Sequence, residues 1–279
     1  MRPEEYRLIR EFMNDLCGLV MDAESLQTVE RRLVDRVVDL RLRTFSEYYR
    51  YLRYHPRRHT EQERAIDALT TNETYFFREM SQLNAFTGEV LPALREGGEE
   101  RRTLNVWSAG CSTGEEVYTL AILITESALF HDWDVRVFGN DISRRVLQTA
   151  RSASYRAASF RALPAGYDHY FLNEGDRRVV VPRIRALCHF GHFNLLDDAR
   201  VAIVGKVDAI FCRNVLIYLD NESRRRLIGS FYERLQPGGY LMLGHSESLL
   251  NTSTAFELAH LKGDLAYRRP HGPERGDGS

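Results

Sequence analysis

Residues 2–71 carry apolar side chains at steps of three and four, the spacing that places them on one face of a helix. Shorter patterns of the same kind predict helices over 45–54 and 61–69. No strand pattern interrupts them, so we expect a small all-helical N-terminal domain over residues 1–71. The two longest apolar stripes are Tyr6, Ile9, Met13, Leu16 and Val20, and Leu26, Val29, Leu33, Val37 and Leu40.

From residue 101 onward, apolar runs bounded by turns alternate with helical patterns. This succession of strand, helix and strand predicts an α/β fold with a mainly parallel sheet covered on both faces. Two short alternating runs about a turn, 256–261 and 265–269, predict a terminal β-hairpin. The five long runs are TLNVWSA (103–109), DVRVFGND (134–141), LCHFGHFN (187–194), KVDAIFCRN (206–214) and GYLMLGHSE (239–247).

The segments outside these two parts complete the expected domain organisation. Residues 72–100 are expected to form an interdomain linker and a helix. The sheet domain spans 101–270, and about 160–190 of it, which fits neither a helix nor a core strand, is expected to be an inserted antiparallel flap. The polar end of the chain, 271–279, is expected to be a disordered tail.

Composition and charge narrow the class of protein. The formal net charge of the 279 residues is −1, which gives no general attraction to nucleic acid. No apolar segment approaches the roughly 20 residues of a membrane span, and the N-terminus lacks a secretory signal. The four cysteines show no paired C-x-x-C spacing, so we expect neither a metal site nor disulfides. These features favour a cytoplasmic protein without membrane insertion, and we expect a monomer.

The turn after the first long run, Gly110–Gly114, carries the first chemical signal. It leads from a strand into a helix that begins near Glu115, the geometry of a ligand crevice at the carboxyl ends of parallel strands. The turn lacks the lysine of a Walker loop and the full G-x-G-x-x-G pattern, and Glu115 and Glu116 would repel a phosphate. Complementarity to the helix N-terminus is the other explanation for these glutamates, worth roughly 0.3–1 kcal/mol.

The second long run ends in Asp141, whose carboxylate can accept hydrogen bonds from both hydroxyls of a ribose. A nucleoside without phosphates therefore suits this crevice better than a nucleotide. S-adenosylmethionine combines an adenine, a ribose and a sulfonium with no phosphate.

Several stretches occur together in an order that resembles one known family, the chemotaxis receptor glutamate methyltransferases (the CheR family). They are TTNETYFFRE, VWSAGCSTGEE, NDIS, FNLLD, DAIFCRNVLIYLD, LQPGGYL and GHSES. The resemblance implies a class I methyltransferase-like, Rossmann-like sheet domain that binds S-adenosylmethionine and releases S-adenosylhomocysteine. The cofactor contacts that it implies are Asn72, Thr74, Arg78, Glu115, Asp141, Asn194, Leu195, Arg213 and Asn214.

The resemblance also implies the reaction, transfer of a methyl group to glutamate carboxylates in the cytoplasmic domain of a chemotaxis receptor. A glutamate with an ordinary pKa of about 4.3 is already ionised near neutral pH, so no catalytic acid or base is expected. Arg78 and Arg213 are both candidates to hold a carboxylate of substrate or cofactor. Arg32, Arg36 and Arg43 share a helix face by their spacing and, with the flap, are candidates for receptor contact.

Three other functions share parts of this pattern. The enzyme could methylate a different carboxylic acid, since the cofactor residues would be the same. A module that binds S-adenosylmethionine for signalling without turnover would keep them as well. A nicotinamide oxidoreductase is disfavoured by the incomplete glycine pattern and the acidic helix start.

Overall fold

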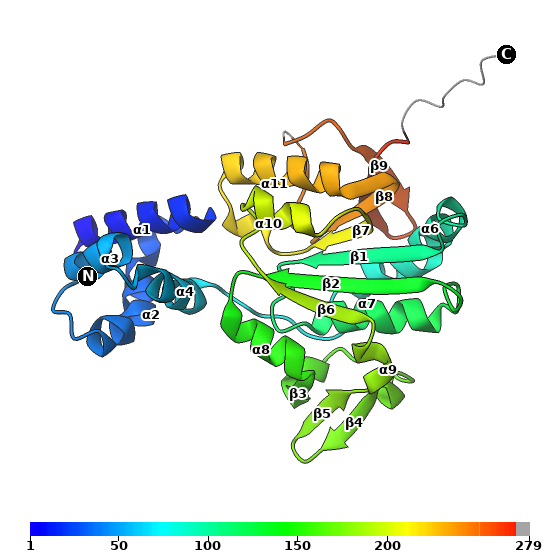
Figure 1. The fold of residues 1–279 in the computed structure, drawn as a ribbon, viewed down its shortest axis with the longest axis horizontal. Helices are drawn as coiled ribbons and strands as arrows, with labels where there is room; N and C mark the ends of the chain where they lie inside the picture. The colour runs from blue at the N-terminus through cyan, green and yellow to red at the C-terminus, as the bar shows by residue number, and fades with distance from the viewer. Residues whose placement is uncertain (251, 272–279) are drawn as a thin grey trace.

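The structure, a computed structural model, describes residues 1–250 and 252–271. A group of blue helices at one side of Figure 1 is joined by an extended segment to a sheet with helices around it. The tail expected over 271–279 lies, apart from His271, outside the described residues. None of the described helices is both long and apolar enough to cross a membrane.

The N-terminal helices pack around their own apolar core. They are α1 (Pro3–Cys17), α2 (Leu26–Asp39), α3 (Phe45–Tyr54) and α4 (Arg58–Leu69), with a short 3-10 turn, η1 (Ala23–Ser25), before α2. The predicted stripes supply most of this core, as Ile9, Met13 and Leu33 are fully buried. Val20 is an exception: α1 ends at Cys17, and the side chain of Val20 is 43% exposed. The prediction of an all-helical N-terminal part is confirmed, but the predicted first apolar stripe extends beyond the end of α1.

The arginine face expected on α2 is mostly occupied by contacts within this helical part. Arg36 pairs with the buried carboxylate of Glu61 on α4 at 2.7 Å, and Nη1 of Arg32 donates to the carbonyl of Leu69 at 2.6 Å. Both side chains therefore tie α2 to α4. Arg43 lies beyond the end of α2 at Asp39, so the predicted helix face shared by the three arginines is wrong, whereas their contact with a receptor stays a prediction. The exposed positions of α2 include Arg31, Val34, Asp35, Val38 and Asp39.

The sheet has seven strands in the order β6-β2-β1-β7-β8-β10-β9. The first five are mutually parallel, and the hairpin of β9 and β10 adds to β8 in antiparallel fashion. This confirms the predicted α/β fold with its terminal hairpin. The strands are β1 (Thr103–Ala109), β2 (Asp134–Asp141), β6 (Cys188–His192), β7 (Val207–Cys212), β8 (Leu235–Leu243), β9 (Glu257–Leu261) and β10 (Asp264–Arg268).

Alternate residues of the central strands enter two separate apolar clusters, one on each face of the sheet. Val106 and Phe211 belong to one cluster, and Trp107 and Ile210 to the other. Helices α10 (Asp198–Ile203) and α11 (Asn221–Arg234) cover the second cluster. The first is covered by α5 (Met80–Ala85), a π-helical turn η2 (Phe86–Val90), α6 (Leu91–Gly97), α7 (Glu115–Glu126) and α8 (Arg144–Ser152).

The inserted flap is a separate three-stranded antiparallel sheet, seen below α8 in Figure 1. Its strands, in spatial order, are β3 (Ser154–Arg156), β5 (Arg177–Val180) and β4 (Phe171–Glu174). Two 3-10 turns, η3 (Ala157–Phe160) and η4 (Asp168–Tyr170), and the short helix α9 (Pro182–Arg185) complete it. An inserted antiparallel flap is therefore present, and its first strand begins before the expected start near residue 160.

Candidate cofactor site

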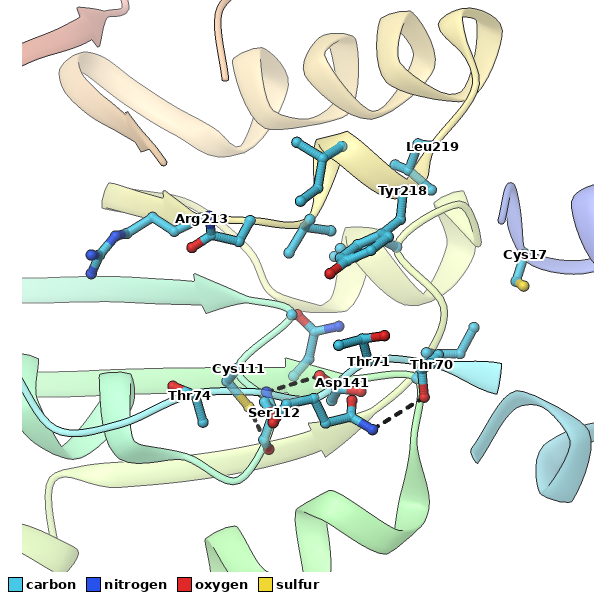
Figure 2. A pocket seen from close by; sticks show the side chains of 18 of the residues that line it. Cys17, Thr70, Thr71, Thr74, Cys111, Ser112, Asp141, Arg213, Tyr218 and Leu219 are labelled. Carbon is cyan, nitrogen blue, oxygen red and sulfur yellow. Dashed lines mark hydrogen bonds between the residues drawn. The ribbon is translucent and has the colours of Figure 1, made fainter. Parts of the chain in front are cut away.

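A cavity opens at the carboxyl ends of β1, β2 and β7. The chain leaves β1 toward β2 on one side, whereas β7 lies on the other side of β1, so the strand order reverses here. Such a switch point is where open α/β sheets bind ligands, because the two connections separate and leave a crevice. Figure 2 shows the cavity with Asp141 and Ser112 on one wall, Tyr218 and Leu219 opposite, and Cys17 at one end.

The structure brings most of the predicted cofactor-contact residues together around this cavity. Of the nine, only Glu115 is not among the residues that line the cavity. The eight that do are Asn72, Thr74, Arg78, Asp141, Asn194, Leu195, Arg213 and Asn214.

Asp141 is the most buried acid on the cavity wall, with an exposed fraction of 7%. Its Oδ2 accepts from the backbone N–H of Ser112 and its Oδ1 from that of Ser143, both at 2.9 Å. Burial raises the pKa of Asp141 above its ordinary value, although these two hydrogen bonds act in the opposite direction. Each oxygen accepts one bond from the backbone and keeps a lone pair for a donor in the cavity.

The turn between β1 and α7 passes close to the loop that follows β7. Gly110 has a φ of +76°, and a Cβ at this position would lie 2.6 Å from Cγ2 of Val215. A larger residue would therefore be strained and would push the two walls apart. Gly110 allows the turn and the loop to form a narrow crevice.

The two glutamates at the start of α7 point to different places. Oε2 of Glu115 accepts from Thr113 Oγ1 at 2.6 Å, and its Oε1 accepts from Ser159 Oγ of the flap region at 2.9 Å. Burial raises the pKa of Glu115. Glu116 does line the cavity. Glu116 is thus the glutamate on the cavity wall, where its oxygens already accept from Ser108 Oγ at 2.7 Å and Arg213 Nη1 at 3.1 Å. Glu115 does not line the cavity, and its cofactor contact stays a prediction.

The two candidate arginines differ in how far they are already engaged. Nη1 of Arg213 lies 3.1 Å from Glu116 and Nη2 lies 3.0 Å from Glu79, while Nη2 also donates to the carbonyl of Arg78 at 2.7 Å. Only 3% of the Arg213 side chain is exposed. The Arg78 side chain is 29% exposed, and its ion pair with Glu79 is longer, at 3.7 Å.

Residues 70–79 cross the cavity as a strap between the helical part and the sheet. Oγ of Ser112 donates to the carbonyl of Asn72 at 2.9 Å, which fixes the strap against the β1–α7 turn. Phe76 and Phe77 are fully buried and act as anchors further along. The N–H of Phe76 donates to the carbonyl of Ser159, so the strap also contacts the flap region.

The helical part supplies wall residues that the sequence did not indicate. Cys17 and Leu19 line the cavity. The N–H of Val20 donates to the carbonyl of Tyr218 at 2.8 Å, and Leu19 and Leu219 form an isolated antiparallel bridge. These contacts join segments about 200 residues apart, for which a single sequence holds no signal.

The chemistry of the wall fits S-adenosylmethionine. Oδ1 of Asn214 is buried and has no hydrogen-bond partner among the described residues, so it can accept from an amino group. Asp141 can accept from ribose hydroxyls, and Leu195, Leu219 and Tyr218 offer apolar surface to an adenine. Among the described residues no lysine lines the cavity, and Arg213 is already paired with two carboxylates, so the wall does not favour phosphates.

Comparison with protein families gives matches over nearly the whole chain. Residues 72–263 match the family model described as "CheR methyltransferase, SAM binding domain". Residues 4–70 match the one described as "CheR methyltransferase, all-alpha domain".

Similar proteins carry a consistent name. Chemotaxis protein methyltransferase 2 of Vibrio cholerae is 36% identical over 267 residues, covering 94% of this chain and 91% of that protein. Chemotaxis protein methyltransferase 2 of Pseudomonas aeruginosa is 36% identical over 256 residues, covering 90% and 88%. Among solved structures, the N-methyltransferase NodS of Bradyrhizobium japonicum with S-adenosylhomocysteine is 16% identical, covers 74% of this chain and 93% of its own, and has a TM-score of 0.39.

Proposed function

Because the chain belongs to the CheR methyltransferase family and is an S-adenosylmethionine-dependent methyltransferase, we propose that it converts glutamate side chains of chemotaxis receptors to methyl esters. The observation that carries the proposal is the cavity itself, in which Asp141, Asn214 and Arg78 meet at the strand ends. Asp141 and Asn214 suit a nucleoside without phosphates, and the guanidinium of Arg78 can bind the carboxylate of a substrate glutamate.

We propose that the cofactor lies along the β1 and β2 ends of the cavity. The Asp141 carboxylate would accept from the ribose hydroxyls, and Leu195, with the backbone of Asn194, would face the adenine. The side-chain amide of Asn194 is already used, since it donates to the carbonyl of Leu16 and accepts from the N–H of Leu196. The remaining proposed cofactor contacts are Asn72, Thr74, Arg213 and Asn214, with Glu116 in the place expected for Glu115. Arg78, which was expected to be a cofactor contact, is instead proposed to meet the substrate.

The role of the chain in catalysis is to position two reactants. When bound, S-adenosylmethionine supplies an electrophilic methyl group on a positively charged sulfur. The substrate carboxylate is ionised already, so a side-chain oxygen attacks without a general base. Holding the reacting groups in line can lower a barrier by roughly 7–11 kcal/mol. The strap and the loop after β7 also exclude water, which strengthens the attraction between carboxylate and sulfonium.

We assign the substrate carboxylate to Arg78. Nη1 and Nη2 of Arg213 already contact Glu116, Glu79 and the carbonyl of Arg78, and only its buried Nε has no hydrogen-bond partner among the described residues. The guanidinium of Arg78 is more exposed, its Nη1 donates to the carbonyl of Glu73 at 3.0 Å, and its one carboxylate partner, Glu79, is 3.7 Å away. Because a guanidinium presents two parallel N–H donors, Arg78 can orient a carboxylate while one of its oxygens points to the methyl group.

The proposal extends to the surfaces that would meet the receptor. Residues 1–71 and 101–270 would act as separate domains joined by 72–100, with the receptor helices between the helical domain and the flap. Arg43, which is exposed, and the exposed face of α2 are candidate contacts beside the partly engaged Arg32 and Arg36. We place the enzyme in the cytoplasm as a monomer, because the cytoplasmic part of a receptor is the proposed substrate.

Incubation with cofactor labelled in its methyl group and a purified receptor cytoplasmic domain tests this function. A glutamate methyl ester releases its label as methanol in alkali, so base-labile label on the receptor is the expected result. Replacement of the receptor glutamates by alanine is the matched control and should remove the label. Label that survives alkali, or equal labelling of small carboxylic acids, would contradict the proposal.

A further inference from the structure

The loop that follows β7, residues 213–219, forms one wall of the cavity but has no regular backbone pairing at its start. Asn214 has a φ of +59°, in the left-handed region that asparagine tolerates better than most residues. Arg213, Asn214, Val215, Ile217 and Tyr218 of this loop all line the cavity. A 3-10 turn, η5 (Leu216–Tyr218), orders the second half of the loop, so another group must fix residues 213–215.

The carboxylate of Glu247 accepts hydrogen bonds from this loop and from the residue that follows β8. Oε2 of Glu247 accepts from the backbone N–H of Asn214 at 2.7 Å and from that of Gly244 at 2.9 Å. Oε1 accepts from the N–H of Val215 at 2.9 Å and from that of Ile217 at 3.3 Å. Glu247 lies in the GHSES stretch after β8, so it connects the carboxyl ends of β7 and β8.

The backbone of the neighbouring strand end is shaped to admit this carboxylate. A Cβ at Gly244 would lie 2.9 Å from Oε2 of Glu247 and 3.0 Å from the backbone nitrogen of Asn214. Any side chain there would have to displace one of the two. The N–H of Glu247 also donates to the carbonyl of Gly244 at 2.9 Å, which closes a turn around the glycine.

We propose that Glu247 is a positioning residue for the methyl transfer, acting through the loop 213–219 without touching either reactant. Its carboxylate accepts from the N–H groups of Asn214, Val215 and Ile217. These hydrogen bonds would fix the positions of Asn214 and Tyr218 in the cavity. Val215 in turn abuts Gly110 of the β1–α7 turn. Hydrogen bonds to a charged acceptor are stronger than neutral ones, so a carboxylate suits this task better than an amide. This inference rests on the proposed cofactor site.

Replacing Glu247 by glutamine tests the role of the charge. Glutamine keeps one acceptor oxygen but turns an NH₂ group toward the backbone donors. We expect the Kd for S-adenosylhomocysteine to rise by about tenfold or more, as loss of charged hydrogen bonds of this kind implies. Glu247→Asp keeps the carboxylate and should recover most of the affinity. Glu233→Gln, whose side chain is 72% exposed, is the matched control and should bind like the wild type.

A second measurement separates positioning from general destabilisation. In amide hydrogen exchange, peptides covering 213–219 should exchange faster in Glu247→Gln, while peptides covering β1 keep wild-type protection. If Glu247→Gln does not fold, Gly244→Ala should give the same local loss and weaker binding, because the new Cβ crowds the carboxylate. Wild-type affinity in Glu247→Gln, or equally weak binding by Glu247→Asp and Glu247→Gln, would overturn the inference.

A failure of the role proposed for Glu247 can be distinguished from a failure of the proposed function. If the wild type binds S-adenosylhomocysteine but does not methylate a receptor, the substrate assignment fails and the role of Glu247 stands on the binding data. If the wild type does not bind S-adenosylhomocysteine at all, the cofactor site itself is wrong, and this inference falls with it.

Discussion

The guanidinium of Arg213 lies 3.1 Å from the carboxylate of Glu116, and it also contacts Glu79. Removing one partner of a buried ion pair costs more than the pair contributes, because it leaves an uncompensated charge. Arg213→Met should therefore lower the free energy of unfolding by roughly 3–5 kcal/mol in urea titrations. Arg136→Met, whose 62%-exposed side chain pairs with an exposed aspartate, should cost less than about 1 kcal/mol. Similar losses of unfolding free energy in both variants would contradict a stabilising role for the ion pairs of Arg213.

Arg78 should affect turnover more than cofactor binding. In Arg78→Met, we expect kcat for receptor methylation to fall by about 100-fold or more, the range seen when a charge-stabilising donor is removed. The Kd for S-adenosylhomocysteine should change little, since the proposed partner of Arg78 is the substrate. Radiometric assays and calorimetry on the same preparation measure the two quantities. A large rise in Kd with an unchanged kcat would assign Arg78 to the cofactor instead.

Cofactor affinity should fall at acidic pH because of Asp141. Burial raises the pKa of this carboxyl above its ordinary value of 3.8, so protonation begins at a higher pH than for an exposed aspartate. The ionised form accepts from ribose hydroxyls; affinity is thus full above the raised pKa and declines as pH falls through it. Calorimetry between pH 4.5 and 8 should show this decline in the wild type.

Asp141→Asn supplies the control for this pH dependence. It should bind S-adenosylhomocysteine more weakly at pH 8 and show a flat profile at lower pH, since an amide does not titrate in this range. A decline that persists unchanged in Asp141→Asn would place the titrating group elsewhere.

Gly18 should control how the helical part closes on the cavity. Its φ is +72°, and a Cβ there would lie 2.7 Å from Cδ1 of Leu196. Gly18→Val should therefore separate the segment that carries Cys17 and Leu19 from the loop at Leu219 and weaken binding of S-adenosylhomocysteine several-fold. Gly88→Ala meets no atom within 4 Å and is the matched control. Wild-type affinity in Gly18→Val would show that this contact does not shape the site.

Glu5 should contribute to stability only above acidic pH. Burial alone would raise the pKa of Glu5, but hydrogen bonds from Arg2 and Ser46 outweigh it and lower the pKa to about 2, against 4.5 ordinarily. The resulting stabilisation is fully present above pH 4.5 and is lost as pH falls toward 2. Urea unfolding between pH 2.5 and 6 should show a shallower decline for Glu5→Gln than for the wild type.

Local patterns were sufficient for most of the fold. The runs that became β1, β2 and β7 are apolar and bounded by turns, and the wall residues Asp141 and Asn214 follow directly from the strand ends. Strand β8 was harder: it begins at Leu235 and includes Pro237 and Gly238, whereas the predicted run starts at Gly239. A register shift against β7 absorbs these residues, and register depends on the partner strand.

The differences between the predicted and observed side-chain contacts also depend on distant parts of the chain. They are set by the residue, far away in the sequence, that each side chain contacts. Nothing near Arg36 in the sequence indicates Glu61 as its partner, and both Glu115 and Glu116 begin α7 with the same local pattern. Hydrogen bonds from Thr113 and from the distant Ser159 hold the Glu115 carboxylate away from the cavity. Binding residues on adjacent segments can therefore be named from sequence, whereas their orientation cannot.

The bridge between Leu19 and Leu219 makes the cavity a product of two parts of the chain that are 200 residues apart. During synthesis on the ribosome, a nascent chain that has completed its helical domain and β1 still lacks the opposite wall. Ligand-dependent stabilisation thus becomes available only late in translation, and the N-terminal helices must remain folded without it until β7 and its loop emerge.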